Sequence, residues 1–237
     1  MKLLLRPSAS RMHRAEAWKQ SAYAFIPYET HFGELCGFAD DVVAAGHGFG
    51  MHPHRDMEIS TVMLAGAQRH QDSTGSTQLV ESNMVQTMSA GTGIRHSEVN
   101  ASAVEGFHSF QIWVYPKTRA TTPRHEAFRY EPRLKRDRFL LALSPDRREG
   151  SALLGADAFL SVASLTAGST HRYALCAPGN GVYLHCAAGA VQIAGQVLGT
   201  GDAIGLWDLE GCDVVASEAS DCELVLVEVP MQRGVHL

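Results

Sequence analysis

The chain has 237 residues, of which 45% are hydrophobic, and a formal net charge of −5 from 25 acidic and 20 basic side chains. This length suits one large domain or two domains of about 100 residues each, and the composition is that of a globular protein. The acidic balance gives no reason to expect direct binding to nucleic acid. No apolar run approaches the ~20 residues of a membrane span, so no membrane association is expected.

The cysteines indicate a reducing environment. Five are widely spaced and form no C-x-x-C pair, namely Cys36, Cys176, Cys186, Cys212 and Cys222. An odd number without pairing motifs is typical of free thiols. The apolar run at residues 3–5 is much shorter than a signal-peptide core and is followed by Arg6 and Pro7. We therefore expect a soluble, cytoplasmic protein.

The N-terminal fifth of the chain has mixed patterns. Residues 10–24 allow a short helix, although the periodicity is poor, and residues 22–28 allow a strand. Glycines then alternate at Gly46, Gly48 and Gly50, which predicts unusual backbone angles or close approach of another segment. His-Pro-His and a β-type run follow these glycines, so they form neither a phosphate loop nor a dinucleotide fingerprint.

From residue 58 onward, short β-type segments dominate both halves of the chain. They cover residues 58–64, 67–71, 78–82, 85–88, 107–115, 139–143, 159–165, 181–186, 191–194, 196–198, 203–206, 212–216 and 223–229. Glycine-containing turns separate these segments, and turns every 8–12 or so residues predict an all-β sandwich or barrel. The similar punctuation of the two halves predicts two β modules in tandem.

Residues 118–137 differ in composition from their surroundings. They contain two prolines, few aliphatic side chains and, counting Arg138 just beyond, seven basic side chains. We interpret this segment as the connector between a domain at residues 1–130 and a second domain at residues 131–237. Its charges are expected to be solvated, and the alternative is a binding patch.

Two pairs of possible metal ligands carry the chemistry of the first half. His52 and His54 form one pair, and His96 and Glu98 form the other. Side chains at i and i+2 of a strand point to the same face. If the two strands lie close together, three imidazoles and a carboxylate meet on one inward face. This donor set suits a divalent first-row transition metal with open coordination positions.

The segment 46–100 resembles the two metal motifs of cupins, with Gly91 in place of the usual proline of the second motif. More specifically, four segments resemble the pirin family, and a fifth continues the match. They read His-Pro-His-Arg-Asp-Met-Glu at 52–58, Leu-Ala-Gly at 64–66, His-Gln-Asp-Ser at 70–73, Ser-Ala-Gly-Thr-Gly-Ile-Arg-His-Ser-Glu at 89–98 and Gln-Ile-Trp-Val at 111–114.

The resemblance implies an all-β bicupin of two tandem antiparallel jelly-roll barrels with few short helices. It also implies one metal in the N-terminal barrel, held by four ligands carried over by position: His52, His54, His96 and Glu98. Glu58 is expected to support these ligands, with direct coordination of the metal as the alternative. The C-terminal barrel, with only the isolated His171 and His185, is expected to hold no metal. Fe(II) is implied as the metal, with Zn, Mn, Ni, Co and Cu as alternatives that the sequence does not separate.

Bacterial pirins that resemble quercetin 2,3-dioxygenase imply a metal-dependent dioxygenase that opens a flavonol such as quercetin with O2. The metal would hold the enolate of the substrate, and Glu98 would remain bound or act as the base. The alternative is a non-catalytic, redox-sensitive regulator that acts through protein partners. A roomy apolar pocket above the metal would favour the enzyme, and a charged partner surface the regulator. We expect a monomer.

Overall fold

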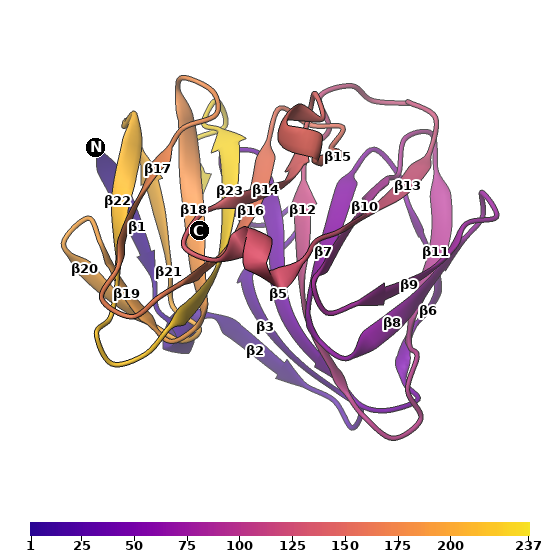
Figure 1. The fold of residues 1–237 in the computed structure, drawn as a ribbon. Helices are drawn as coiled ribbons and strands as arrows, with labels where there is room; N and C mark the ends of the chain where they lie inside the picture. Colours follow the sequence, from indigo (N-terminus) through magenta and orange to yellow (C-terminus); the bar gives the residue numbers. More distant parts are fainter.

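The computed structural model describes residues 1–237 and is built almost entirely of β-strands in two halves that lie side by side (Figure 1). Each half contains one large sheet and one four-stranded sheet. The only helices are three 3-10 turns, η1 (Ser8–Ser10), η2 (Pro132–Lys135) and η3 (Arg148–Gly150). The prediction of an all-β bicupin with few short helices is confirmed. No helix has both the length and the apolar character that crossing a membrane requires.

The N-terminal half pairs a nine-stranded sheet with a four-stranded sheet. The large sheet has the order β13 (Arg124–Arg129), β10 (Met84–Ser89), β7 (Glu58–Ala65), β12 (Phe107–Val114), β5 (Leu35–Val43), β3 (Lys19–Phe25) and β2 (Met12–Ala15). In addition, β4 (His31–Phe32) pairs with β5, and β24 (Val235–His236) pairs with β4. The small sheet has the order β6 (Gly48–His54), β11 (Ile94–Asn100), β8 (Ala67–Asp72) and β9 (Thr77–Glu81).

The C-terminal half repeats this plan with a seven-stranded and a four-stranded sheet. The large sheet has the order β1 (Lys2–Arg6), β21 (Ala203–Trp207), β18 (Asn180–Ala188), β23 (Cys222–Pro230), β16 (Phe159–Leu165), β14 (Leu140–Ser144) and β15 (Ala152–Leu153). The small sheet has the order β17 (Thr170–Ala174), β22 (Gly211–Ala216), β19 (Ala190–Ile193) and β20 (Gln196–Gly199). Among the strand pairs, β14 with β15 is parallel and the others are antiparallel.

The two terminal strands are exchanged between the halves. Strand β1 pairs with β21 of the C-terminal sheet over five residues, and β24 pairs with β4 of the N-terminal sheet. A boundary at residue 130 therefore separates β2–β13 from β14–β23, but each half borrows one strand from the far end of the chain. The division into domains 1–130 and 131–237 stays a prediction.

The core is distributed unequally between the two barrels. One apolar cluster of 24 buried residues lies where the two large sheets face each other and draws on both halves, for example Phe110 and Tyr183. A second cluster of 17 residues fills the C-terminal barrel. The N-terminal barrel holds only two small apolar clusters, of six and five residues. Its interior therefore has room for buried polar side chains.

The expectation of a helix within residues 10–24 is wrong. Residues 12–15 and 19–25 form β2 and β3, which pair as an antiparallel hairpin. Strand β3 also pairs with β5 along most of its length. This non-local pairing outweighs the weak local helical preference of the segment.

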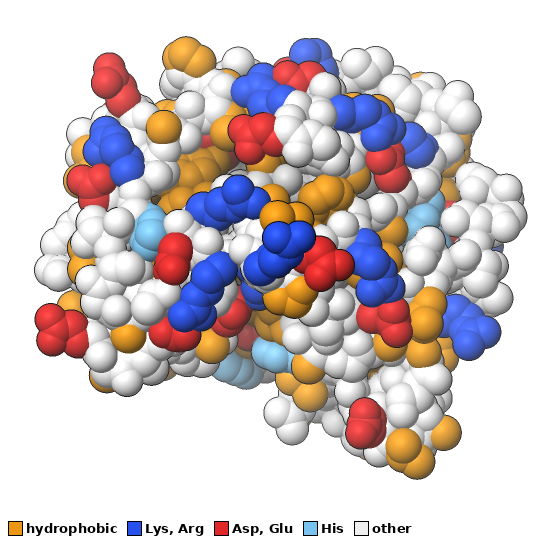
Figure 2. Space-filling model, viewed as in Figure 1, with side chains coloured by type: hydrophobic (Ala, Val, Ile, Leu, Met, Phe, Trp, Pro, Cys, Tyr) orange, Lys and Arg blue, Asp and Glu red, His pale blue; other side chains and the backbone are white.

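The interpretation of residues 118–137 as a plain connector is partly wrong. Residues 124–129 form β13, which pairs with β10 over six residues. Several basic side chains of the segment are paired, because Arg129 contacts Glu81, Lys135 contacts Glu223 and Arg136 contacts Asp221. On the face of the molecule that Figure 2 shows, Lys and Arg side chains lie across the centre, with Asp and Glu side chains beside them.

Candidate metal centre

The strands that carry the two predicted ligand pairs are neighbours in the small sheet of the N-terminal half. Strand β11 lies between β6 and β8. His96 stands opposite His52 on β6 and opposite Asp72 on β8, while Glu98 stands opposite His70. The register between β6 and β11 shifts at a bulge between His96 and Glu98.

The alternating glycines before His52 serve different purposes. A Cβ on Gly48 would lie 2.3 Å from the Glu98 carbonyl oxygen and 2.5 Å from the Val99 Cα, so only glycine lets β6 approach β11 this closely. Gly46 adopts a left-handed conformation, with φ of +69°. Gly50 has open space around it and needs neither property.

Three of the predicted ligands converge. The ligand atoms of His52, His54 and His96 all lie within 4.8 Å of one another, and their ring centroids are 4.4 to 4.9 Å apart. His96 is buried, and neither of its ring nitrogens has a hydrogen-bond partner. A buried polar group without a partner is rare and costly. A divalent transition metal would satisfy it, so these residues fit a metal.

Two histidines of this cluster, His54 and His96, are held neutral. Burial, with a smaller contribution from His52, lowers the pKa of His54 to about 4. Burial and the neighbouring His52 and His54 lower the pKa of His96 to about 2. Neutral imidazoles keep a lone pair for a metal at pH 7, so no proton has to be displaced from His54 or His96 when an ion binds.

Glu98 is surrounded by amide donors. Its Oε1 accepts hydrogen bonds from Gln68 Nε2 at 3.0 Å and Gln86 Nε2 at 2.6 Å, with Thr61 Oγ1 at 3.4 Å. Its Oε2 accepts one hydrogen bond, from Gln111 Nε2 at 2.8 Å. An ionised carboxylate has about four acceptor positions, so Oε2 keeps one that is unused.

Two of these glutamines are themselves held in orientation by ring nitrogens. Trp113 Nε1 donates to Gln111 Oε1 at 3.0 Å, and His125 Nε2 lies 3.1 Å from Gln86 Oε1. With each carbonyl engaged in this way, each NH2 group faces Glu98. Burial and the adjacent His70 lower the pKa of His125 to about 4.

Strand β8 adds His70 and Asp72. The ligand atoms of His70, His96 and Glu98 form a second group within 4.8 Å of one another. His70 Nε2 lies 2.9 Å from Asp72 Oδ2, and the ring of His125 stacks on His70 with centroids 4.0 Å apart. Burial favours the neutral carboxyl of Asp72, but hydrogen bonds from Thr74 and His70 outweigh it and lower its pKa.

The site residues predicted from the sequence do not include His70, Asp72 or the glutamines around Glu98. Gln68, His70 and Asp72 share one face of β8 at the same i, i+2 spacing as the histidine pair, and that pattern was the available signal. Gln86 and Gln111 come from β10 and β12 of the facing sheet. No local spacing connects these two residues to the histidines.

Glu58 lies elsewhere than expected. Its Oε2 accepts hydrogen bonds from Ser89 Oγ at 2.7 Å and from the Gly155 backbone N–H at 2.9 Å, with Arg124 3.9 Å away. Burial raises its pKa despite these partners. Because Gly155 belongs to the C-terminal half, Glu58 joins the two halves rather than supporting the histidine ligands.

A hollow of about 840 Å³ lies beside His54 and opens to solvent. Its aromatic lining is Tyr28 and Trp113, and the ring of Trp113 meets that of His54 edge to face at 4.9 Å. Arg55 and Arg95 contribute positive charge to its wall. The hollow is therefore roomy, but its lining is mixed rather than apolar.

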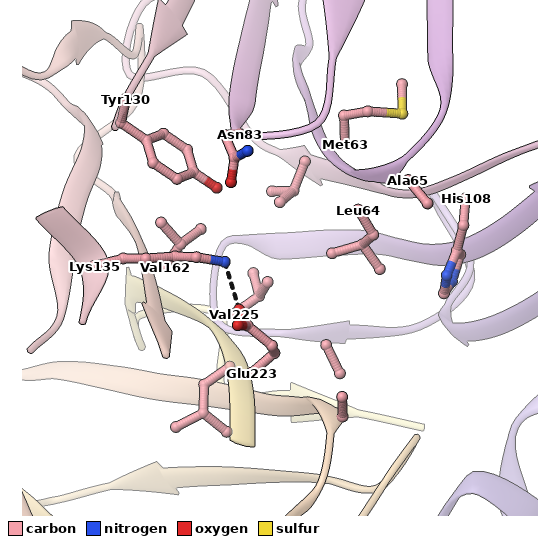
Figure 3. A pocket seen from close by; sticks show the side chains of 14 residues that line it. Met63, Leu64, Ala65, Asn83, His108, Tyr130, Lys135, Val162, Glu223 and Val225 are labelled. Atoms are coloured by element: carbon pink, nitrogen blue, oxygen red, sulfur yellow. Dashed lines mark hydrogen bonds and ion pairs between the residues drawn. The ribbon is translucent and has the colours of Figure 1, made fainter. Parts of the chain in front are cut away.

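The more apolar cavity lies between the two halves (Figure 3) and measures about 360 Å³. Leu64 from β7 faces Val162 and Val225 from the C-terminal half, and an ion pair of Lys135 with Glu223 lies among the lining side chains. None of the predicted metal ligands lines this cavity. The roomy apolar pocket that would favour an enzyme is thus not above the histidines.

Comparisons with known proteins cover nearly the whole chain. A family model described as Pirin matches residues 6–114, and one described as the quercetinase C-terminal cupin domain matches residues 141–229. The quercetin 2,3-dioxygenase of Escherichia coli (strain K12) is 36% identical over 234 residues, which are 96% of this chain and 99% of that protein.

Solved structures agree with these matches. The bacterial pirin YhhW from Escherichia coli, in complex with nickel(II), has a TM-score of 0.88 at 36% identity and covers 97% of this chain and 99% of that one. A protein from Geobacillus kaustophilus has a TM-score of 0.78 at 19% identity, covers 98% of this chain and 96% of that one, and shares the fold.

Proposed function

This chain belongs to the pirin family, and from that premise we propose that it is a metal-dependent oxidoreductase of the quercetin 2,3-dioxygenase type. The single observation that carries the proposal is His96, a buried imidazole without a partner, where it meets His52 and His54 beside an open hollow. The relative of that name in Escherichia coli aligns over almost the full length of both chains. The substrate we propose is a flavonol such as quercetin, with O2.

We propose that His52, His54, His96 and Glu98 hold the metal. The nickel-bound relative supports a divalent transition ion, and our proposal for the native ion is Fe(II). The same nitrogen and oxygen donors also accept Ni, Mn, Co, Cu and Zn, so availability decides among them. When bound, such an ion would polarise the hydroxyl group of the flavonol and hold its enolate.

The surrounding side chains prepare the site for an aromatic substrate with several hydroxyl groups. Glu98 either remains on the metal or acts as the base that takes the substrate proton. The Trp113 ring beside His54 offers an aromatic face at the hollow. Arg55, held by the Thr92 carbonyl at 2.8 Å, and Arg95 place donors where phenolate oxygens would lie.

The alternative of a non-catalytic regulator has less support. A basic surface for a protein partner would require unpaired charge, and the pairing of Arg129, Lys135 and Arg136 with acidic side chains reduces that charge. We retain a monomeric chain as a proposal, and a cytoplasmic location as a second one, because all five cysteines are free thiols.

The test is turnover of quercetin in air by protein loaded with Fe(II) under anaerobic conditions, followed by loss of the flavonol absorbance. We expect turnover in the wild type and none in the His52→Ala/His54→Ala variant. His47→Ala, an exposed histidine in the same glycine-rich segment, is the matched control and should keep its rate. If protein that holds one iron per chain leaves quercetin unchanged, the proposal of a flavonol substrate is rejected.

A further inference from the structure

The interior of the N-terminal barrel contains a second ligand cluster behind the outer histidines. We propose that His70, His96 and Glu98 form an inner position for a divalent transition-metal ion, which shares His96 and the proposed ligand Glu98 with the outer position at His52 and His54. An ion occupies one position or the other. The inference shares metal binding with the proposed function but does not depend on flavonol turnover.

The inner cluster is closed and lacks partners for its nitrogens. The side chains of His70, His96 and Glu98 belong to residues that are at most 1% exposed, and their ligand atoms lie within 4.8 Å of one another. His70 Nδ1 and both ring nitrogens of His96 have no hydrogen-bond partner. Buried nitrogens without partners cost free energy, and an ion bound among them would recover it.

Asp72 presets His70 for binding a metal. The hydrogen bond between His70 Nε2 and Asp72 Oδ2, at 2.9 Å, places the ring proton on Nε2 and leaves the lone pair on Nδ1. A carboxylate that holds the far nitrogen of an imidazole is the usual outer partner of a histidine ligand. His125, stacked on His70 at 4.0 Å, restrains the ring.

The charges of the cluster also favour a dication. Glu98 is a buried carboxylate with no Lys or Arg within 4.0 Å. Buried negative charge without a cationic partner is costly. An ion at the inner position would compensate it and would take the unused acceptor position on Glu98 Oε2, which gives a set of two nitrogens and one oxygen that suits first-row divalent metals.

The two positions differ in access. The hollow beside His54 reaches the outer position, whereas the inner ligands are buried. A metal ion at the inner position is out of reach of a substrate in the hollow. The distribution of the metal ion between the two positions therefore sets the fraction of metal-loaded protein whose metal a substrate can reach.

Equilibrium dialysis against Ni(II), with metal content measured by mass spectrometry, tests the inner position without any activity measurement. The His52→Ala/His54→Ala variant removes two outer ligands and should still bind about one Ni(II) per chain, with lower affinity than the wild type. Adding His70→Gln should abolish this residual binding. A double variant that binds no Ni(II), or a triple variant that binds as well as the double one, would overturn the inference.

The matched control adds His108→Gln to the same double variant. His108 forms a similar pair, with its Nε2 2.6 Å from Asp40 Oδ1, but it belongs to neither ligand group, so residual binding should remain. If the His70→Gln triple variant fails to fold by circular dichroism, Asp72→Asn replaces it and should weaken residual binding; unchanged binding again overturns the inference. Wild-type protein that leaves quercetin unchanged, together with retained Ni(II) binding in the double variant, would reject only the proposed function.

Discussion

Glu98 illustrates how single residues prepare the centre. Its carboxylate accepts hydrogen bonds from three glutamine side chains, and ring nitrogens of Trp113 and His125 hold two of those glutamines in place. Hydrogen bonds to a carboxylate stabilise its ionised form and fix its direction. The amide groups, rather than the strand backbone alone, therefore orient the proposed fourth ligand.

Replacing Gln111 with leucine tests this arrangement. Gln111→Leu leaves Glu98 Oε2 without its donor and the Trp113 indole N–H without its acceptor. Partners of this kind typically change metal affinity by about 10–100-fold. We expect Ni(II) affinity to fall by that factor, measured by competition with a chromophoric chelator. Gln192→Leu, at an exposed position of β19, should leave affinity unchanged, and equal affinities in both variants would contradict the prediction.

Among the structural elements, the small sheet of the N-terminal half determines the site. Strand β11 brings His96 between β6 and β8, and Gly48 permits the close contact of β6 with β11. The turn before β11 is equally constrained. Gly91 has φ of +46°, and a Cβ there would lie 2.0 Å from the Thr121 carbonyl oxygen.

A single methyl group at this turn should therefore be costly. Gly91→Ala combines a left-handed conformation with a clash against backbone, and we expect it to destabilise the protein by about 2–4 kcal/mol. The measurement is the urea midpoint, with hydrogen exchange of β11 to localise the effect. Gly50→Ala lies in the same motif region with no atom within 4 Å of its Cβ and should change the midpoint little. Equal midpoints for the two variants would show that the turn tolerates the side chain.

The whole molecule is held together by the apolar cluster between the two large sheets. His185 lies in this region, with ring centroids 5.0 Å from Phe38 and 4.7 Å from Phe110, and neither of its nitrogens has a partner. Burial, followed by the charge of Arg11, lowers its pKa to about 3. This neutral histidine lies at the contact between the halves rather than at a metal.

The lowered pKa of His185 makes the stability of the folded protein depend on pH. Below its ordinary pKa of about 6.5, His185 binds a proton in the unfolded chain before it does so in the folded one. Its contribution to stability is complete above about pH 6.5. It is lost as pH falls toward 3, by up to about 1.4 kcal/mol per pH unit.

His185→Phe removes this contribution. We expect the variant, free of metal, to lose less stability than the wild type between pH 6.5 and 4, measured by urea unfolding at each pH. His236→Phe, at an exposed position of β24, is the matched control and should follow the wild type. Parallel curves of stability against pH for His185→Phe and the wild type would refute the contribution assigned to His185.

The sequence by itself determined the fold class and the pairing of the outer histidines on one face, because both follow from the two-residue period of β-strands. Strand residues alternate between faces, so His52 and His54 share a face wherever the strand lies, and so do His96 and Glu98. The repeated turns indicated two β modules for the same reason. The alternating glycines predicted a close approach of another segment, and of the three only Gly48 lies at the close contact between β6 and β11.

The tertiary structure alone decided what surrounds those histidines. Gln86 and Gln111 reach Glu98 from the facing sheet, and His70 stands beside Glu98 only because β8 pairs with β11. The strand at residues 19–25 and the exchanged terminal strands likewise depend on partners far away in the chain. Which residues become neighbours in this way depends on strand pairing and packing between distant segments, so a local sequence pattern does not predict them.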